Sequence, residues 1–248
     1  MIECGASQGL WALPWIIALG NASAKRSLSP GTRHVRALAI EASESQSETR
    51  SFWDAQDLRF KASQSGTDLR FTGRNWEFEW IQRAVVAKDG PVFFPQVTVD
   101  SDNGAQATDE TATRDIRGKE VDYQRVEGVR LGELIARQES LDFLHLDVQG
   151  TELDMLLNGE FDALSGRAKV MLLGTHSRAA EYEAFRRLPQ LGFTLLAEES
   201  CGYSRSDELG RFEGEDQPNE LTLTVDGEQL WLSSDAVDEA RTAGLIRI

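Results

Sequence analysis

The chain has 248 residues, a length that suits one large domain or two small ones. Hydrophobic residues make up 40% and charged residues 27%, so the chain can build a full core, which excludes wholesale disorder. A formal net charge of -15 repels phosphate backbones and anionic lipid heads, which argues against a nucleic-acid or membrane partner. We expect a single domain over residues 1–248.

Cysteine content and the N-terminal region bear on the compartment. Two cysteines, Cys4 and Cys201, fit free thiols in a reducing cytoplasm better than a disulfide framework. The apolar stretch at 10–20 resembles a secretory signal. However, the residues before it contain Glu3 and no Lys or Arg, so the basic region of such a signal is missing. It is also too short to span a bilayer. We interpret it as a buried helix and expect a cytoplasmic protein.

Hydrophobic patterning predicts alternating strands and helices. The expected strands cover residues 1–4, 34–41, 75–87, 91–99, 141–147, 169–174, 192–198 and 220–232. The expected helices cover residues 10–20, 50–65, 131–137, 151–158 and 178–191, the last one burying Ala179, Tyr182, Phe185 and Leu188. We predict a polar loop at 21–33 and a hairpin turn at Asp226-Gly227. The alternation predicts an α/β fold with helices on both faces of a parallel sheet.

The polar segment 100–128 has few large apolar residues and is predicted to be a loop. It is either a lid over a site or a plain surface insertion, and the second alternative is slightly favoured. This segment and residues 199–219 are the candidates for the walls of a substrate pocket.

A glycine-rich turn follows the first strand, in the run Glu3-Cys4-Gly5-Ala6-Ser7-Gln8-Gly9. A strand, such a turn and a helix together can hold a nucleotide-like cofactor, because glycines let the backbone approach it. The run is neither G-x-G-x-x-G nor a phosphate loop. The run contains an acid and no lysine, which disfavours binding of an anionic polyphosphate and is compatible with binding of the cationic S-adenosylmethionine. An ordinary glycine turn is the alternative, and this run alone does not displace it.

Acidic residues end two of the predicted strands. Glu41 ends the second strand, where a carboxylate can accept the ribose hydroxyls of an adenosyl group; a solvent-facing carboxylate is the alternative. Asp147 ends the strand at 141–147, where it points into the crevice in which α/β sheets bind ligands. Glu152 begins the next helix, and its alternative role is to favour the helix dipole.

His176 follows the strand at 169–174 and is a candidate general base, balanced evenly against a histidine satisfied by local backbone groups. Asp147 is the competing base. Asp147 and Glu152 could instead help to hold a divalent cation, which we rank lower because two carboxylates are a thin ligand set. We expect His145 to be packed in its strand and His34 to be exposed.

These motifs, in this order, resemble the FkbM family of methyltransferases. The family's opening motif is matched by Glu3 to Gly9, and its second acid by Glu41. The most specific match is the signature that runs from Leu131-Gly132-Glu133-Leu134 to Asp142-Phe143-Leu144-His145-Leu146-Asp147-Val148-Gln149-Gly150-Thr151-Glu152. Ala42 stands where the family often has proline, and His145 where it usually has lysine.

The resemblance implies a Rossmann-like class I fold, a seven-stranded mostly parallel sheet with an antiparallel last strand. It implies S-adenosylmethionine as cofactor and O-methylation of a hydroxyl on a sugar, polyketide or other small-molecule or glycan acceptor. The implied cofactor contacts are Glu3, Gly5, Ala6, Ser7, Gly9, Glu41, Ala42 and Ala84. The implied catalytic residues are His176 and Asp147.

Two other classes of function compete with this interpretation. A catalytically silent protein would keep the fold and use its acidic surface and the 100–128 segment to bind a partner. A nicotinamide dehydrogenase is disfavoured by the missing G-x-G-x-x-G motif. The sequence does not identify the acceptor or the oligomeric state.

Overall fold

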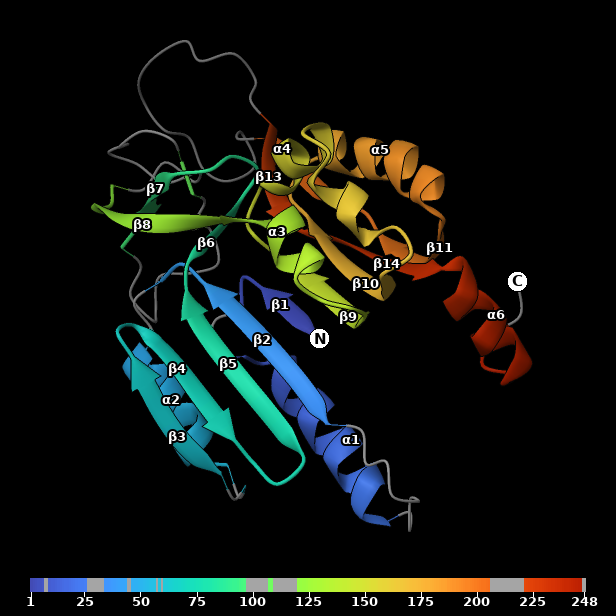
Figure 1. Cartoon of the computed structure of the whole chain (residues 1–248). Coiled ribbons are helices and arrows are strands. Elements are labelled where there is room, and N and C mark those ends of the chain that lie inside the picture. Colours follow the sequence, from blue (N-terminus) through green and yellow to red (C-terminus); the bar gives the residue numbers. More distant parts are fainter. Residues whose placement is uncertain are drawn as a thin grey trace.

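A computed structural model of the chain describes residues 1–6, 9–25, 34–43, 46–56, 58, 60–96, 107–108, 120–205 and 221–246. Its centre is a nine-stranded sheet with helices on both faces (Figure 1). In spatial order the strands are β11 (Phe193–Glu199), β14 (Gly227–Ser233), β10 (Ala168–Thr175), β9 (Leu141–Leu146), β1 (Ile2–Cys4), β2 (Val35–Glu41), β5 (Trp76–Gln82), β4 (Asp68–Thr72) and β3 (Lys61–Ser65).

The middle of the sheet is parallel and its two edges are antiparallel. Strands β10, β9, β1, β2 and β5 are paired in parallel. On one side β14 runs antiparallel to β10 and β11, and on the other β4 runs antiparallel to β5 and β3. The prediction of seven mostly parallel strands is therefore corrected to a mixed sheet of nine. The last strand of the chain, β14, is antiparallel to both of its neighbours.

Each face of the sheet has its own apolar core. Helices α1 (Ala12–Lys25) and α2 (Gln46–Asp54) cover one face, where Trp53 and Phe78 are fully buried. The other face is covered by α3 (Leu131–Ala136), α4 (Glu152–Leu157), α5 (Arg178–Arg187) and the 3₁₀ helices η1 (Glu160–Leu164) and η2 (Leu188–Leu191). Helix α6 (Ser234–Thr242) packs on β14. This two-sided burial is the reason for the near-continuous apolar runs of the central strands.

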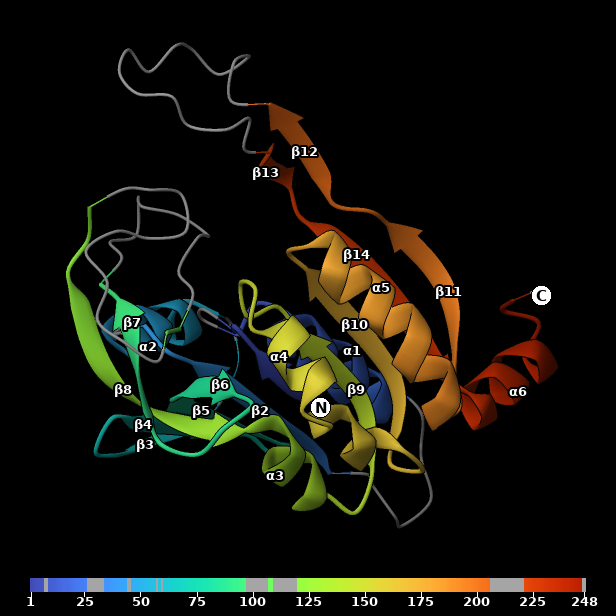
Figure 2. The ribbon, with the colours of Figure 1, turned by 90° about the horizontal axis from the view of Figure 1, so that it is seen from above.

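Two small sheets flank the main one. One consists of β6 (Ala84–Val86), β8 (Tyr123–Arg130) and β7 (Pro91–Pro95). The other pairs β12 (Gly202–Arg205) with β13 (Leu221–Val225) and extends the β11–β14 pair away from the main sheet (Figure 2). The prediction of a hairpin turn at Asp226-Gly227 is wrong. Strand β13 pairs with β12, whereas β14 pairs with β10 and β11, so residue 226 joins two different sheets.

Other boundaries differ from the sequence predictions. Helix α1 continues to Lys25, so the predicted loop begins later than residue 21. The helix is not fully buried, because Ile17 within it and Trp11 just before it are exposed. The helix predicted at 50–65 stops at Asp54, and the β3–β4 hairpin follows with Gly66 in its turn at φ +60°. Strand β8 replaces the last part of the loop predicted at 100–128. Residues 100–106 and 109–119, and with them the lid prediction, lie outside the described residues.

Of the residues predicted to be buried along 178–191, Leu188 is buried, but helix α5 itself buries a different face from the one predicted. Tyr182 and Phe185 are 68% and 41% exposed, whereas Ala180, Glu181 and Ala184 are buried. Glu181 tolerates burial because its carboxylate accepts the Cys201 N–H and pairs with an arginine. A pattern based only on apolar residues misses such a compensated acid.

Glu3 joins the first strand to the first helix. Glu3 is 1% exposed, and its carboxylate accepts the N–H groups of Trp11 and Ala12 at 3.0 and 2.9 Å. These belong to the N–H groups that the first turn of a helix leaves unpaired, so Glu3 caps α1. Burial is the largest influence on this carboxyl and raises the pKa of Glu3 to about 7.

This raised pKa predicts a pH-dependent stability. Because the folded pKa lies above the ordinary value of 4.5, the free energy of unfolding should fall as pH rises from about 4.5 to about 7. The contribution of Glu3 to that fall is up to ~3 kcal/mol. Glu3→Gln should flatten the profile, as measured by urea unfolding from pH 4.5 to 8. If the free energy of unfolding depended on pH in the same way in the wild type and in Glu3→Gln, the raised pKa of Glu3 would be contradicted.

Gly5 permits the close approach of the turns after β1 and β9. It has φ +73°, and a Cβ atom there would lie 1.6 Å from the Asp147 carbonyl oxygen. The amide of the same Asp147 donates to the Cys4 carbonyl at 3.0 Å. A side chain at residue 5 would therefore push the two strand ends apart.

Gly5→Ala should cost far more stability than Gly66→Ala. Gly66 has φ +60° but open space around it, so its substitution should cost ~1 kcal/mol for the left-handed backbone alone. Gly5→Ala adds the backbone collision and should cost at least ~3 kcal/mol. Urea unfolding of both variants checks this, and equal losses would mean that the β1 and β9 ends separate without cost.

Candidate active site

The candidate residues gather where the order of the strands reverses. From β1 the chain proceeds to β2 and β5 on one side, and later to β9 and β10 on the other. Gly5 follows β1, Glu41 ends β2 and Asp147 follows β9. Because these strands are parallel, the three residues lie at the same edge of the sheet. Open α/β sheets bind ligands at this position.

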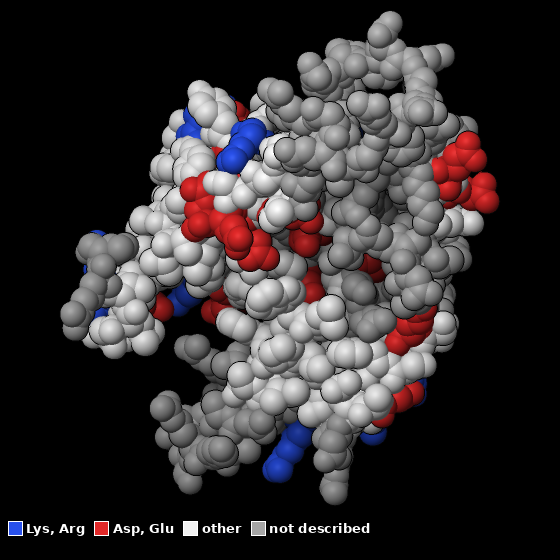
Figure 3. All heavy atoms as spheres, turned by 180° about the vertical axis from the view of Figure 1, so that it is seen from behind, with Lys and Arg blue, Asp and Glu red and all other residues white. Residues whose placement is uncertain are grey.

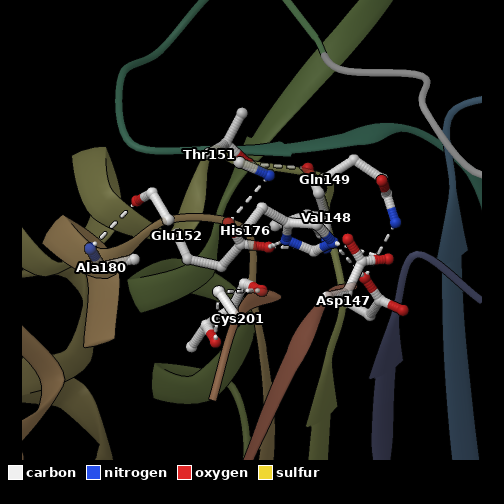
Figure 4. Close-up of polar contacts among 12 residues, drawn as sticks. Asp147, Val148, Gln149, Thr151, Glu152, His176, Ala180 and Cys201 are labelled. Atoms are coloured by element: carbon white, nitrogen blue, oxygen red, sulfur yellow. Dashed lines mark hydrogen bonds and ion pairs between the residues drawn. The ribbon is translucent and has the colours of Figure 1, made fainter. Parts of the chain in front are cut away.

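His176 lies between two acids that the sequence places far from it. Its Nδ1 is 2.9 Å from Oε1 of Glu152, and its Nε2 is 3.3 Å from Oδ1 of Asp147 (Figure 4). The side chains of His176 and Glu152 are 3% and 0% exposed, whereas that of Asp147 is 40% exposed. The three predicted residues therefore form one cluster, with Asp147 on its open side.

Glu152 is fixed by the turn between β9 and α4. Its two oxygens accept the N–H groups of Val148 and Gly150 at 3.1 and 2.8 Å. That turn needs unusual backbone angles, because Gln149 and Gly150 have φ values of 55° and 104°. Glu152 thus satisfies the turn and the histidine together, which goes beyond the helix-dipole role that we considered for it.

The electrostatics of the cluster favour a charged histidine. Burial opposes a charge on the ring, but the carboxylates of Asp147 and Glu152 outweigh it and raise the pKa of His176 to about 10. Burial likewise opposes charge on Asp147, and His176 outweighs it, so the pKa of Asp147 is lowered. These pKa shifts favour an imidazolium ion at His176 and an ionised carboxylate at Asp147 at neutral pH.

A cavity of about 280 Å³ opens beside this cluster. Asp147 lines it together with His145, Gly174, Glu199, Val225, Asp226, Gly227 and Glu228. Acidic groups dominate this wall, as they dominate several patches of the face shown in Figure 3. Asp226 also approaches the buried histidine, with its Oδ2 3.9 Å from Nε2 of His176. The cavity favours a ligand that is cationic or rich in hydroxyl donors.

Sequence reasoning missed Asp226 and Glu228 of this wall, whereas Glu199 lies in a segment that was predicted to contribute to it. Glu199 ends β11, and Asp226 and Glu228 flank the start of β14. The segment 199–219, which was proposed for the pocket wall, includes Glu199 but neither Asp226 nor Glu228. Its residues 199–205 are described, and 206–219 lie outside the described residues.

The predicted cofactor turn is held to the second strand through its backbone. The amides of Gly5 and Ala6 donate to the Ile40 carbonyl at 3.0 and 3.2 Å. Gly9 has φ +84°, and a Cβ atom there would lie 2.7 Å from the Phe78 ring. Ser7 lies outside the described residues. The turn is thus fixed beside Glu41. Of the predicted cofactor-binding and catalytic residues that the structure describes, Asp147 is the one that lines the cavity.

The remaining predicted residues are mostly covered. Glu41 is 9% exposed, and its Oε1 accepts the Ser43 amide at 2.9 Å. Ala42 and Ala84 are buried together in an apolar cluster with side chains of β6, β7 and β8. Glu3 uses both carboxylate oxygens to cap α1. It can therefore act on a cofactor only through the turn that it holds.

The two other histidines match their predictions. His145 is 7% exposed and packs on Trp11, with 5.2 Å between the ring centroids. Burial lowers the pKa of His145, which favours the neutral ring. His34 is exposed at the start of β2.

Comparison with known proteins gives two matches. The family model of the methyltransferase FkbM domain matches residues 3–205. A putative methyltransferase from Jannaschia sp. (strain CCS1) is 39% identical over 61 residues, which cover 25% of this chain and only 22% of that protein. No solved structure matches the chain. Among the described residues, no helix is long and apolar enough to cross a membrane.

The family match spans the glycine turn, both strand-end acids and the histidine cluster. The fold brings these two strand-end acids, Glu41 and Asp147, to one edge of the sheet. The chain belongs to the FkbM methyltransferase domain family.

Proposed function

We propose that the chain transfers a methyl group from S-adenosylmethionine to a hydroxyl of a small-molecule or glycan acceptor. The observation that carries this proposal is the position of Asp147. It lies beside the glycine turn after β1 and also lines the acidic cavity. A donor held by the turn and an acceptor held in the cavity would then meet at this residue.

The chemistry requires little beyond binding and alignment. The acceptor oxygen attacks the methyl carbon, the carbon–sulfur bond breaks on the opposite side, and the sulfonium becomes a neutral thioether. Holding the two reactants in line supplies much of the rate acceleration. Carboxylates near the donor also favour the cationic sulfonium.

The hydroxyl proton must leave during this reaction, and we assign its acceptance to Asp147. His176, our candidate base from the sequence, is held as an imidazolium between two carboxylates, and a protonated ring accepts no further proton. Asp147 is ionised and 40% exposed toward the cavity. His176 then keeps Asp147 oriented and charged.

On the donor side, Glu41 is the proposed acceptor for the ribose hydroxyls, through the carboxylate at the end of β2. Support comes from its place next to the glycine turn, since the Gly5 and Ala6 amides bind the carbonyl of Ile40, one residue earlier.

Glu41→Gln should weaken binding of S-adenosylmethionine and S-adenosylhomocysteine by about tenfold or more, because hydrogen bonds to a charged group are lost. Calorimetric titration of both ligands measures this. The matched control is Glu79→Gln, in the middle of the adjacent strand β5, which should leave affinity unchanged. Absence of binding to the folded wild-type chain would refute the proposal.

Asp147→Asn should separate binding from chemistry. Donor affinity should stay within about threefold, while kcat falls by about 10² to 10⁴ because the proton acceptor is lost. S-adenosylhomocysteine formation is followed by mass spectrometry across a panel of sugars and polyhydroxylated compounds. Donor binding without product for any acceptor, in wild type as in the variant, would favour the silent binding protein instead.

A further inference from the structure

Three acids of the cavity wall form one row across four strands of the main sheet. In the pairing of β10 with β14, Gly174 lies opposite Glu228, and in the pairing of β14 with β11, Glu228 lies opposite Glu199. Asp147, which follows β9, stands beside Gly174, where a Cβ atom would lie 3.2 Å from the Asp147 carboxylate carbon. Because Gly174 has no side chain, the cavity stays open between Asp147 and Glu228.

This row brings like charges together without compensation. Glu199 and Glu228 are direct cross-strand partners, a position in which two charges of the same sign destabilise a sheet. Within the described part of the chain, no lysine or arginine lines the cavity or forms an ion pair with Glu199, Asp226 or Glu228. His176 does not line the cavity and is itself held between two carboxylates. The wall therefore carries an excess of negative charge that a cationic ligand would neutralise.

A buried histidine in the same wall lacks a partner. His145 lines the cavity and is 7% exposed, and its Nδ1 forms no hydrogen bond with any residue that the structure describes. Buried polar atoms are nearly always paired, so an unpaired one in a cavity wall indicates a partner that a ligand supplies. Because burial lowers the pKa of His145 and favours the neutral ring, this residue can bind a hydroxyl group without adding positive charge to the wall.

We propose that the acceptor is a hydroxylated amine of the size of one sugar ring, such as an amino sugar. Its ammonium group binds the carboxylates of Glu199 and Glu228, and a hydroxyl group lies between Asp147 and His145. The cavity of about 280 Å³ is near the lower end of the ~300–1,000 Å³ of small-molecule sites, which suits a single ring. A protonated amine has no free electron pair, so the methyl group goes to the hydroxyl. The role as methyl acceptor rests on the proposed function, whereas binding at this wall does not.

The test is NMR titration of the full chain, labelled with ¹⁵N-histidine, with glucosamine and with glucose in the absence of any methyl donor. The two probes share one ring and differ by the ammonium group that replaces a hydroxyl. Glucosamine should bind about tenfold or more tightly than glucose, because hydrogen bonds between charged groups are the stronger ones. The ring resonances of His145 should shift on binding, whereas those of the exposed His34 should not. Equal affinities, no binding of glucosamine at millimolar concentration, or unchanged His145 resonances would overturn the proposal.

Glu228→Gln should lower the affinity for glucosamine about fivefold or more, because the ammonium group loses one charged partner. The same variant should unfold at a higher temperature, since the repulsion between Glu228 and Glu199 is relieved. The matched control is Glu198→Gln, which removes the same charge from β11 at a position that pairs with Gln229 and does not line the cavity. Its glucosamine affinity should be unchanged. Equal losses in the two variants would mean diffuse attraction by an acidic surface and would overturn the site.

Competition with S-adenosylhomocysteine distinguishes this site from a site for the donor, which has an ammonium group of its own. Saturating S-adenosylhomocysteine should leave the glucosamine affinity unchanged, because the donor is assigned to the glycine turn. Displacement of glucosamine would mean that the acidic wall holds the amino group of the donor and would overturn the proposal. If glucosamine binds as expected but neither S-adenosylmethionine nor S-adenosylhomocysteine does, the proposed function fails while the amine site stands.

Discussion

The buried contact between Glu152 and His176 is the interaction on which the architecture of the site depends. It connects the turn after β9 to the end of β10, and the same carboxylate holds two amides of that turn. Breaking a buried ion pair by removing one partner costs ~3–5 kcal/mol, because the remaining charge is left uncompensated. The position of Asp147 follows from this contact, since it belongs to the turn that Glu152 fixes.

The sequence predicted the parts of this site that stand next to strand ends. Asp147, Glu152 and His176 were each recognised from their place after an apolar run, and parallel strands bring such positions to one edge. Their mutual contacts could not be read from the sequence, because hydrogen-bond partners depend on side-chain directions. The protonation of His176 was missed for the same reason: it results from two acids that approach one ring from opposite sides.

Predictions failed where tertiary contacts override a local pattern. The β3–β4 hairpin was missed because Phe52, Trp53 and Leu58 were interpreted as the apolar residues of one helix that continued past Asp54. Helix α5 was rotated in the prediction because Glu181 is buried with its partners, whereas Tyr182 is exposed. Asp226 was taken for a turn residue, since its neighbouring strands pair with partners that are distant in the chain.

The glycine turn comes from the start of the chain, whereas the acids of the cavity wall other than Asp147 come from its C-terminal part. The turn and Glu41 lie within the first 41 residues, whereas Glu199, Asp226 and Glu228 come from the ribbon formed by β11 to β14. Within the described part of the chain, Asp147 contacts the turn and also lines the cavity. Under the proposed function, evolution could exchange the acceptor by altering the ribbon while the donor-binding half of the molecule stays as it is.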